Sequence, residues 1–404
     1  MSTTTPAKDS SIWWSNAFFF VGVHLAAAYG VYVRPPQFIS WQILAMTVVL
    51  WQLASFGVTV GYHRLYSHRA FRATFGVRLA LAILGTSAMQ GSIKWWCLRH
   101  RLHHRFTDDD VHDPYSATRG LVFSHVGWIF YKTKYERLEL IDREDLERDP
   151  VVCFQHKYYV PLALSFGFVL PTVLGLLWGD PWGGYIWGGL VSRLLIWHCT
   201  FLVNSLAHWD GLQPYSDDNT SRTNWILALL TAGEGNHNFH AFPHDFRSGP
   251  ALFDWDPSKW VILILHRLGL VTGLRRAHED DIKHAEKYME HKAHAHVDDD
   301  YYIEQSWDGE VWDTDRLGAF IKNKPTACII LLNGFAVDAT DYMKEHPGGA
   351  LLLRQYSVLA TDTKIEAFRD ATWAFEGGLN RHSRAAHRRM MQLRVAKVAL
   401  ARVR

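Results

Sequence analysis

The sequence predicts a mostly α-helical fold, in which a four-helix transmembrane bundle carries a histidine-rich helical cap and is followed by a small α+β domain. Four apolar segments approach the roughly 20 residues that a bilayer-spanning helix needs. Groups of histidines stand beside the ends of these segments. From about Ser306 onward, short strand and turn signals replace the long apolar runs. The chain of 404 residues is long enough for two domains.

Composition narrows the class of protein further. The net charge is +2, so the chain lacks the basic footprint of a nucleic-acid-binding protein. Its 18 tryptophans cluster at the ends of apolar runs, as in the aromatic belts at membrane interfaces. Residues 1–11 are polar and lack a signal-peptide pattern. The four cysteines form no C-x-x-C pair, which favours free thiols on the reducing side of a membrane.

The apolar segments are predicted to form two helical hairpins. Residues 17–33 and 38–60 are joined by a short turn, so these two helices cross in opposite directions. Residues 158–178 and 185–206 form the second hairpin, and its turn, 179–184, has no Lys or Arg. The positive-inside rule therefore places both termini and every histidine group in the cytosol.

Charged and polar residues within the bundle and between its helices refine this prediction. Arg193 and His198 are costly in lipid and should face the bundle interior or an aqueous cavity. Residues 79–93 and 121–131 are too short to span, and we expect buried or interfacial helices there. Residues 260–271 are also predicted to lie in the membrane interface.

The C-terminal third differs in character from the rest. Residues 273–305 form a charged linker that we expect to be a solvated helical face. Residues 327–332 are predicted to be a buried strand, and Asn333-Gly334 a hairpin turn. Residues 306–404 thus form a small soluble α+β domain of ordinary size.

A group of three histidines carries the strongest chemical signal. His100, His103 and His104 fall at i, i+3 and i+4 and share one helical face. A structural protein has little reason to crowd three titratable rings there, whereas imidazole is a good ligand for iron, copper and zinc. Similar groups lie near the other apolar segments: His63 with His68, Asn204 with His208, and His237 with His240. We interpret them together as one polynuclear metal site at the end of the bundle.

These motifs resemble those of the membrane acyl-CoA desaturases of the stearoyl-CoA Δ9 type, in the fungal form with a fused C-terminal cytochrome b5 domain. The boxes H-x4-H and H-x2-H-H are present at His63/His68 and at His100/His103/His104. The flanking motifs are Asn204-Ser-x-Ala-His208, Gly233-Glu-Gly235, Phe242-Pro243 and Ser124-His-Val-Gly-Trp128. The b5 signature is His346-Pro-Gly-Gly349, followed by Glu376-Gly-Gly-x-Asn-Arg-His382. The resemblance covers nearly the whole chain.

The sequence departs from the family pattern at two places. The third box of the family is H-x2-H-H, but here Ala241 follows His240, so one histidine is missing. His244 lies nearby and is a remote candidate to replace it under ordinary imidazole ligation rules. The two expected haem ligands are also farther apart than in a compact b5 domain, with the excess near residues 359–366.

The resemblance implies two irons (a di-iron centre) and haem b as cofactors. The implied iron ligands are His63, His68, His100, His103, His104, His208, His237 and His240, with Asn204 acting through a water. The implied haem ligands are His346 and His382. The implied substrate contacts are Trp51, Ser55, Gln90, Trp96 and Arg99, of which Trp51 would limit chain length and Arg99 would bind a CoA phosphate.

The same resemblance implies an activity and a location. The chain would insert a cis double bond into saturated C16–C18 fatty acyl-CoA, using O2 and electrons from NADH through cytochrome b5 reductase. It would lie in the bilayer of the endoplasmic reticulum, with residues 1–272 as the desaturase domain and 306–404 as the haem domain. Two alternatives stay open: an inactive desaturase-like protein and a related di-iron lipid hydroxylase.

Other polar residues near the boxes receive a simpler interpretation. We expect Asp108, Asp109, Asp110 and Asp113 to form a solvated acidic turn rather than ligands. His112, His125 and His156 are expected to support the ligands from behind or to lie on the surface.

Overall fold

The computed structural model describes residues 10–242, 244–294, 307–344, 346, 348–358, 370–379 and 382–399. The chain folds into two units, Met1–His278 and Glu279–Arg404. The segment 273–305, expected to be a linker, is therefore divided between the units.

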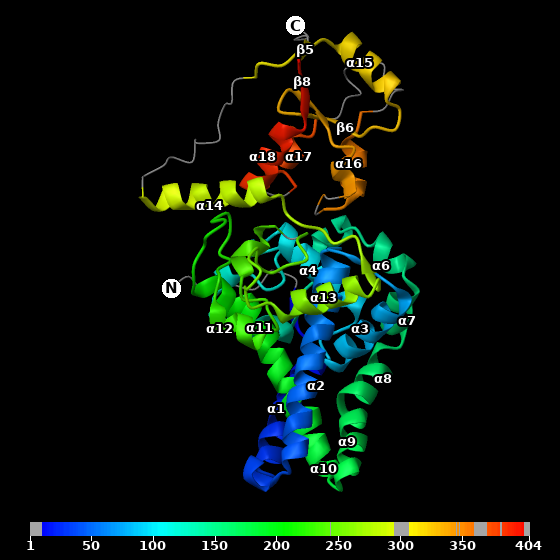
Figure 1. The fold of residues 1–404 in the computed structure, drawn as a ribbon, viewed down its shortest axis with the longest axis vertical. Coiled ribbons are helices and arrows are strands. Elements are labelled where there is room, and N and C mark those ends of the chain that lie inside the picture. Colours follow the sequence, from blue (N-terminus) through cyan, green and yellow to red (C-terminus); the bar gives the residue numbers. More distant parts are fainter. Residues whose placement is uncertain are drawn as a thin grey trace. The chain divides into compact units, whose positions relative to one another are not determined.

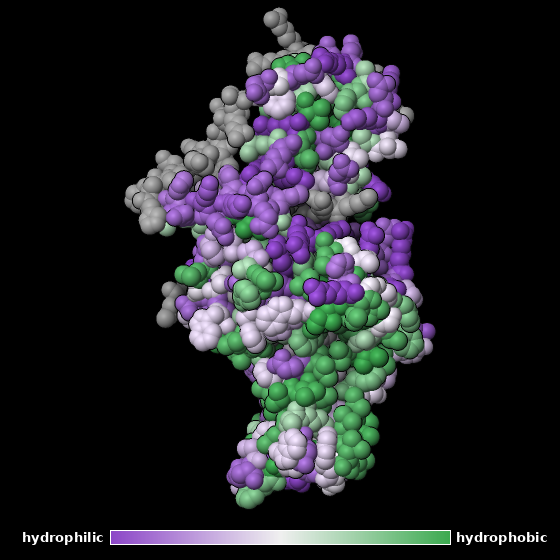
Figure 2. Space-filling model, viewed as in Figure 1, coloured by the Kyte–Doolittle hydropathy of each residue, from purple (hydrophilic) through white to green (hydrophobic). Residues whose placement is uncertain are grey.

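The described residues contain four helices that are long and apolar enough to cross a membrane, as the four apolar segments predict. They cover Trp14–Val33, Trp41–Ser67, Tyr159–Trp178 and Pro181–Trp209. They form the narrow helical stem of the first unit in Figure 1, and Figure 2 shows mostly hydrophobic side chains over this stem. So much exposed apolar surface suits the hydrocarbon of a bilayer rather than water.

The winding of the spanning helices changes along their length. The first spanning helix is α1 (Trp14–Val33), and the second consists of α2 (Trp41–Phe56) and the π-helical η2 (Gly57–Ser67). The third consists of α8 (Tyr159–Leu164), η6 (Ser165–Val169), α9 (Leu170–Gly175) and η7 (Leu176–Trp178). The fourth consists of α10 (Pro181–Gly183), η8 (Gly184–Val191) and α11 (Ser192–Trp209). Turns of π-helix are uncommon and frequently mark functional sites. His63 lies on one of them, in η2.

Aromatic packing and buried polar contacts hold the stem together. The rings of Phe20 and Trp197 are 4.5 Å apart between centroids. Arg193 is buried, and its guanidinium donates to the Gly167 carbonyl at 3.0 Å, so the expectation that it faces the bundle interior is confirmed. His198 is half-buried and contacts His24 at 3.0 Å.

The cap of the first unit consists of short helices and two small strand pairs. Its helices are α3 (Phe75–Ser87), α4 (Ile93–Arg105), α5 (Leu121–His125), α6 (Glu144–Arg148), α7 (Pro150–Lys157), α12 (Trp225–Leu230) and α13 (Pro257–Arg267). Its tighter 3-10 turns are η3 (Ala117–Arg119), η4 (Gly127–Phe130), η5 (Glu136–Leu140) and η9 (His237–Ala241). A further 3-10 turn, η1 (Pro36–Phe38), lies outside the cap, in the turn between α1 and α2. β1 (Ser11–Ile12) pairs with β3 (Tyr131–Lys132), and β2 (Arg72–Ala73) pairs with β4 (Val271–Thr272), both antiparallel.

The helix predicted over 79–93 is displaced toward its N-terminus. α3 covers Phe75–Ser87, because Met89 and Gly91 have φ values of +55° and +96° that a helix cannot contain. A new helix, α4, starts after Ser92, whose hydroxyl accepts the N–H of Trp95 at 3.2 Å. This break matters because α4 carries three of the site histidines.

Close contacts fix α3 and α13 in the cap. A Cβ atom added to Gly57 would lie 2.1 Å from the backbone nitrogen of Gly85, so glycine lets η2 meet α3. On α13, Ile262 is buried while Ile264 is exposed. This two-faced pattern agrees with the interfacial helix predicted for that region.

The second unit contains a four-stranded sheet in the order β5-β8-β7-β6. The strands are β5 (Val311–Trp312), β6 (Ile329–Leu332), β7 (Phe335–Asp338) and β8 (Arg394–Val398). Asn333 and Gly334 have φ values of +51° and +75°, as the predicted hairpin turn between β6 and β7 requires. The accompanying helices are α14 (Glu279–His294), α15 (Thr314–Asn323), α16 (Ala350–Tyr356), α17 (Thr372–Phe375) and α18 (Arg384–Gln392), with the short turn η11 (Tyr342–Lys344).

α14 shows that the expectation of a solvated linker holds only in part. The segment is helical, but α14 belongs to the second unit and contacts α18 there. Arg384 donates to the Tyr288 hydroxyl at 2.9 Å, and Arg388 lies 3.5 Å from Asp281. The excess residues 359–366 lie outside the described residues.

Candidate metal centre and adjoining cavity

Eight histidines meet in the cap beside the stem. They come from η2 and the residue after it, from α4, from the end of α11 and from η9. They form a five-histidine group, His63, His68, His100, His104 and His240, and a three-histidine group, His103, His208 and His237. Within each group, the candidate ligand nitrogens all lie within 4.8 Å of one another. The structure thus brings together all eight histidines singled out in the sequence.

The imidazole nitrogens face one another at short distances. The Nε2 atoms of His63 and His240 are 3.0 Å apart, and those of His208 and His237 are 3.2 Å apart. Burial, followed by the neighbouring imidazoles, keeps the pKa of His68 and of His240 well below the usual value. The rings of His68 and His240 are therefore neutral, with lone pairs available. Converging neutral nitrogens fit divalent metal ions, which would lie between the lone pairs.

Two of these rings have a carboxylate beside their Nδ1 atom. Glu234 Oε2 lies 3.3 Å from His63 Nδ1, and Asp113 Oδ1 lies 2.8 Å from His103 Nδ1. An ionised carboxylate can only accept, so the hydrogen bond from Asp113 places the proton of His103 on Nδ1 and the lone pair on Nε2. The prediction of a solvated acidic turn is therefore wrong for Asp113, whose side chain is buried against a histidine.

A buried arginine fixes the carboxylate behind His63. Arg64 donates to Glu234 at 2.8 Å and to Asp256 at 2.9 Å. Burial alone would raise the pKa of Glu234, but the charge of Arg64, aided by His63, outweighs burial and lowers the pKa from 4.5 to about 2. Glu234 is thus a permanent anion within the Gly233-Glu-Gly235 motif.

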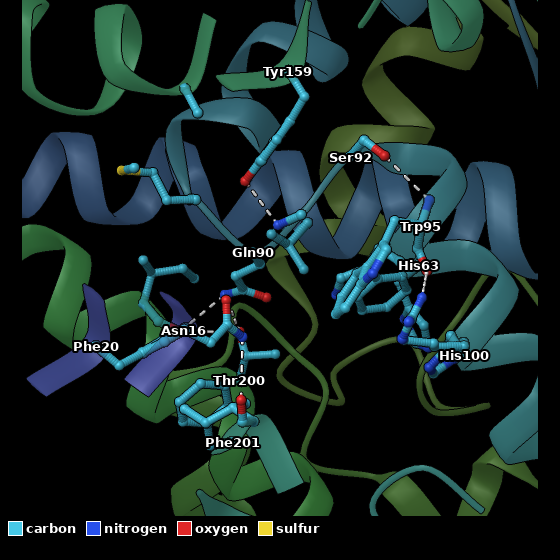
Figure 3. A pocket seen from close by; sticks show the side chains of 18 of the residues that line it. Asn16, Phe20, His63, Gln90, Ser92, Trp95, His100, Tyr159, Thr200 and Phe201 are labelled. Carbon is cyan, nitrogen blue, oxygen red and sulfur yellow. Dashed lines mark hydrogen bonds between the residues drawn. The ribbon is translucent and has the colours of Figure 1, made fainter. Parts of the chain in front are cut away.

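A cavity of about 670 Å³ reaches the five-histidine group from the stem. Four of the five substrate residues inferred from the sequence line it: Ser55, Gln90, Trp96 and Arg99. His63 and His100 form part of its wall, and Figure 3 shows both rings beside Trp95 at one end. The volume lies in the range of small-molecule sites, and apolar side chains dominate the lining.

Trp51 is the substrate residue that does not line the cavity. Its indole lies against Cys199, which does line it. The Ser55 hydroxyl donates to the Trp51 carbonyl at 2.9 Å, one helical turn away. Trp51 therefore supports the wall from behind rather than facing the cavity.

The other cavity residues have clear structural partners. Gln90 donates to the Thr200 hydroxyl at 2.8 Å, which joins the turn after α3 to α11 (Figure 3). The Trp96 ring stacks on His100 with centroids 4.7 Å apart. The Arg99 guanidinium lies 3.8 Å above the Trp95 ring, and burial lowers its pKa from 12.5 to about 10.

The sequence also suggested Asn204 and His244 as candidate residues near the metal groups. Asn204 lines the cavity one helical turn before His208, as its spacing predicts. Among the described residues, His244 belongs to neither histidine group, and its Nδ1 lies 3.2 Å from the His68 carbonyl oxygen. The methyl group of Ala241 offers no ligand atom.

In the second unit, the two candidate haem ligands share one feature. His346 Nδ1 lies 2.9 Å from the Gly349 carbonyl, and His382 Nδ1 lies 2.8 Å from the Phe375 carbonyl. A carbonyl only accepts, so Nδ1 carries the proton and Nε2 the lone pair. This is the tautomer that an axial haem ligand needs.

Some residues of the site could not be found from the sequence. Thr220 Oγ1 lies 2.8 Å from His208 Nδ1, and Asp108 accepts from that hydroxyl at 2.8 Å. Neither residue belongs to a recognisable motif, and 112 positions separate them. Only the tertiary fold brings them together.

The fold and the site define a class of protein: a polytopic helical protein with a polyhistidine metal centre at the end of a membrane-sized bundle. The sequence pattern of the fatty acid desaturase family matches residues 39–244. The chain belongs to this family and is an oxidoreductase.

Relatives agree over most of the chain. A probable acyl-CoA desaturase of Schizosaccharomyces pombe is 37% identical over 95% of this chain and 77% of its own length. Acyl-CoA desaturase 1 of Saccharomyces cerevisiae is 36% identical over 88% of this chain and 68% of its own length. Stearoyl-CoA desaturase 5 of Bos taurus is 36% identical over 65% of this chain and 80% of its own length.

Proposed function

We propose that this protein is an acyl-CoA Δ9 desaturase that introduces a cis double bond into saturated C16–C18 acyl chains. The cavity carries the proposal, because its mostly apolar lining reaches His63 and His100, with the aromatic and cationic side chains of Trp95 and Arg99 at the same cavity. The names of the relatives, acyl-CoA and stearoyl-CoA desaturases, support this substrate class.

The two histidine groups would each hold one iron. His63, His68, His100, His104 and His240 would bind the first, and His103, His208 and His237 the second, with Asn204 reaching it through a water. When bound, the iron pair would supply an O2-derived oxidant for an unactivated methylene pair, which acid–base side chains cannot attack. The residues of this chain bind, orient and enclose the acyl chain.

Burial of the acyl chain supplies much of the binding energy. Each methylene removed from water contributes about 0.8 kcal/mol. The Gln90–Thr200 hydrogen bond and the Trp96 ring fix the wall beside the histidines, which limits the positions that the chain can adopt. Arg99 and Lys157, both on the lining, suit the phosphates of CoA.

The second unit would deliver electrons. A haem b held by His346 and His382 would pass single electrons from NADH through cytochrome b5 reductase. The proposed domains are residues 1–272 for desaturation, 273–305 as a connection and 306–404 for haem binding. Expression in the endoplasmic reticulum membrane, with both termini cytosolic, would place this unit and the metal centre on the same side.

The deciding test is the fatty-acid profile of desaturase-null fungal cells that express the chain. We expect monounsaturated C16 and C18 acids with the double bond at carbon 9, and none from a His100→Ala variant. Hydroxylated acids would instead identify a lipid hydroxylase. Unchanged lipids despite stable expression would identify an inactive relative.

The short third box has its own test. If cells that express the chain form no unsaturated fatty acids, insertion of a histidine after His240 should restore their formation, because it restores the H-x2-H-H pattern of the family. If eight histidines suffice, the inserted residue should leave the product profile unchanged.

A further inference from the structure

The loop after α4 contacts two ligands of the same histidine group. Asp113 meets His103 directly, while Asp108 meets His208 through Thr220. We propose that Asp108 and Asp113 are positioning residues that make the three-histidine group a competent metal site. The proposal rests on the proposed metal function and adds two carboxylates to it.

The Asp113 carboxylate is held in one orientation. Its Oδ1 atom accepts the Tyr115 N–H at 3.1 Å, and its Oδ2 atom accepts the Asp108 N–H at 3.0 Å. The side chain is fully buried, so water does not compete for these contacts. Backbone donors thus hold both carboxylate oxygens of Asp113 in place. The Oδ1 atom also accepts from His103 Nδ1, and this contact directs the Nε2 atom of His103 toward the three-histidine group.

Asp108 acts on the second ligand through a hydroxyl. Its Oδ2 atom accepts the Thr220 N–H at 2.7 Å, and its Oδ1 atom accepts the Thr220 O–H at 2.8 Å. Since that hydroxyl proton is committed to the carboxylate, the Thr220 oxygen must accept from His208 Nδ1. The chain of bonds therefore fixes the tautomer of His208, with the lone pair on Nε2.

The backbone of the loop is shaped for this double contact. Asp108 has a φ of +67°, a left-handed conformation that aspartate tolerates better than most residues. In this conformation its N–H points to Asp113 while its side chain reaches Thr220, which follows α11. Asp108 thus connects the carboxylate that contacts His103 with the hydroxyl that contacts His208.

The three-histidine group needs this support more than its neighbour. It has three imidazoles, whereas the other group has five. With fewer ligands, each ring carries a larger share of the binding, so a misdirected His103 or His208 has a larger effect. Asp113 reaches His103 directly and Asp108 reaches His208 through Thr220, and both histidines are members of this group.

The test measures metal binding rather than turnover. Full-length protein in detergent is stripped with a chelator and titrated with Co²⁺, which can be quantified separately from haem iron and whose visible spectrum reports coordination. We expect two Co²⁺ per wild-type chain. In Asp113→Asn and Thr220→Val variants, one should bind as in wild type and the other roughly 10- to 100-fold more weakly, the usual effect of losing such a contact.

Two matched variants separate positioning from folding. Thr220→Ser keeps the hydroxyl and should restore wild-type binding, while Thr220→Val has nearly the same shape without it. Asp109→Asn is the control within the loop, because the Asp109 carboxylate accepts only from Val111 and His112 in the described contacts, and this variant should bind two Co²⁺ normally.

Each outcome decides one question. If Asp113→Asn and Thr220→Val bind both ions with wild-type affinity and spectrum, the positioning role is wrong. If Asp113→Asn does not fold, the Thr220→Val and Thr220→Ser pair decides the question alone. If wild-type protein binds no Co²⁺ at all, the metal centre of the proposed function fails, which is a different result.

Discussion

At the residue scale, the surroundings of Arg99 suit its proposed role in binding a CoA phosphate. Its guanidinium stacks on Trp95 and donates to the Trp95 carbonyl at 3.3 Å, and no carboxylate among the described residues lies within ion-pair distance. We predict that Arg99→Gln raises KM for acyl-CoA roughly 10- to 100-fold, because a charge-assisted hydrogen bond contributes about 1.5–3 kcal/mol, with little change in kcat.

Arg99→Lys supplies the control for this effect. Lysine keeps the charge but loses the planar surface that stacks on Trp95, so we expect an intermediate KM. Initial rates measured over a range of acyl-CoA concentrations separate the two parameters. A fall in kcat with unchanged KM would show that Arg99 acts elsewhere in the cycle.

Trp51 is a second residue whose role depends on its position behind the wall. Because its indole lies against Cys199 rather than lining the cavity, Trp51→Ala should enlarge the cavity beside Cys199 and shift products toward longer chains. Trp41→Ala is the matched control, since Trp41 is 73% exposed on the stem. Gas chromatography of total fatty acids gives the profile. If both variants keep the wild-type chain lengths, Trp51 does not limit the substrate.

At the scale of elements, one carboxylate joins the segments that carry the first two histidine boxes. Asp145 lies 2.7 Å from both Arg69, which follows His68, and Arg101, which lies between His100 and His103. Burial would raise the pKa of Asp145, but hydrogen bonds and charge from Arg101 and Arg69 outweigh burial and lower the pKa from 3.8 to about 2. Its stabilising effect is therefore complete above about pH 4 and is lost as the pH falls toward 2.

We predict that Asp145→Asn lowers the melting temperature at pH 7, because two arginines lose a shared partner. The difference from wild type should shrink as the pH falls toward 2, since protonation removes the same charge from wild-type Asp145. Glu144→Gln is the control, because Glu144 pairs with Arg148 on the surface. Equal melting temperatures for Asp145→Asn and wild type at pH 7 would contradict the prediction.

Three histidines outside the metal centre join three helices. His24 on α1 lies 3.0 Å from His198 on α11, and His198 lies 3.1 Å from His125 on α5. We predict that His24→Leu and His198→Leu are coupled, with a double-mutant interaction of about 0.5–2 kcal/mol, the range for polar contacts between membrane helices. Unfolding in mixed detergent measures the cycle, and additive effects of the two variants would show that this contact contributes nothing.

At the scale of the whole molecule, the features set by local sequence were predictable. The four spans follow from apolar length, and the turn at Asn333-Gly334 follows from backbone preference. The eight histidines could be chosen because their spacing is local. Their division into five and three could not, because His240 joins His63 across 177 positions.

The burial of individual polar side chains could not be predicted from the sequence. Asp113 stands near three other aspartates, and such a run is usually solvated. Its position against His103 depends on how the loop packs on α4 and on α11, which no local pattern records. The same reason hid Thr220, whose contact with Asp108 spans 112 positions.

The two units also permit a test of their separate roles. His382 belongs to the second unit and the eight histidines of the metal centre to the first. We predict that His382→Ala abolishes haem absorbance and NADH-driven desaturation, while the first unit still binds two Co²⁺ and acyl-CoA. Separately supplied cytochrome b5 should then restore part of the activity, because the acceptor site is intact. Retention of NADH-driven turnover without haem would show that electrons reach the metal centre by another route.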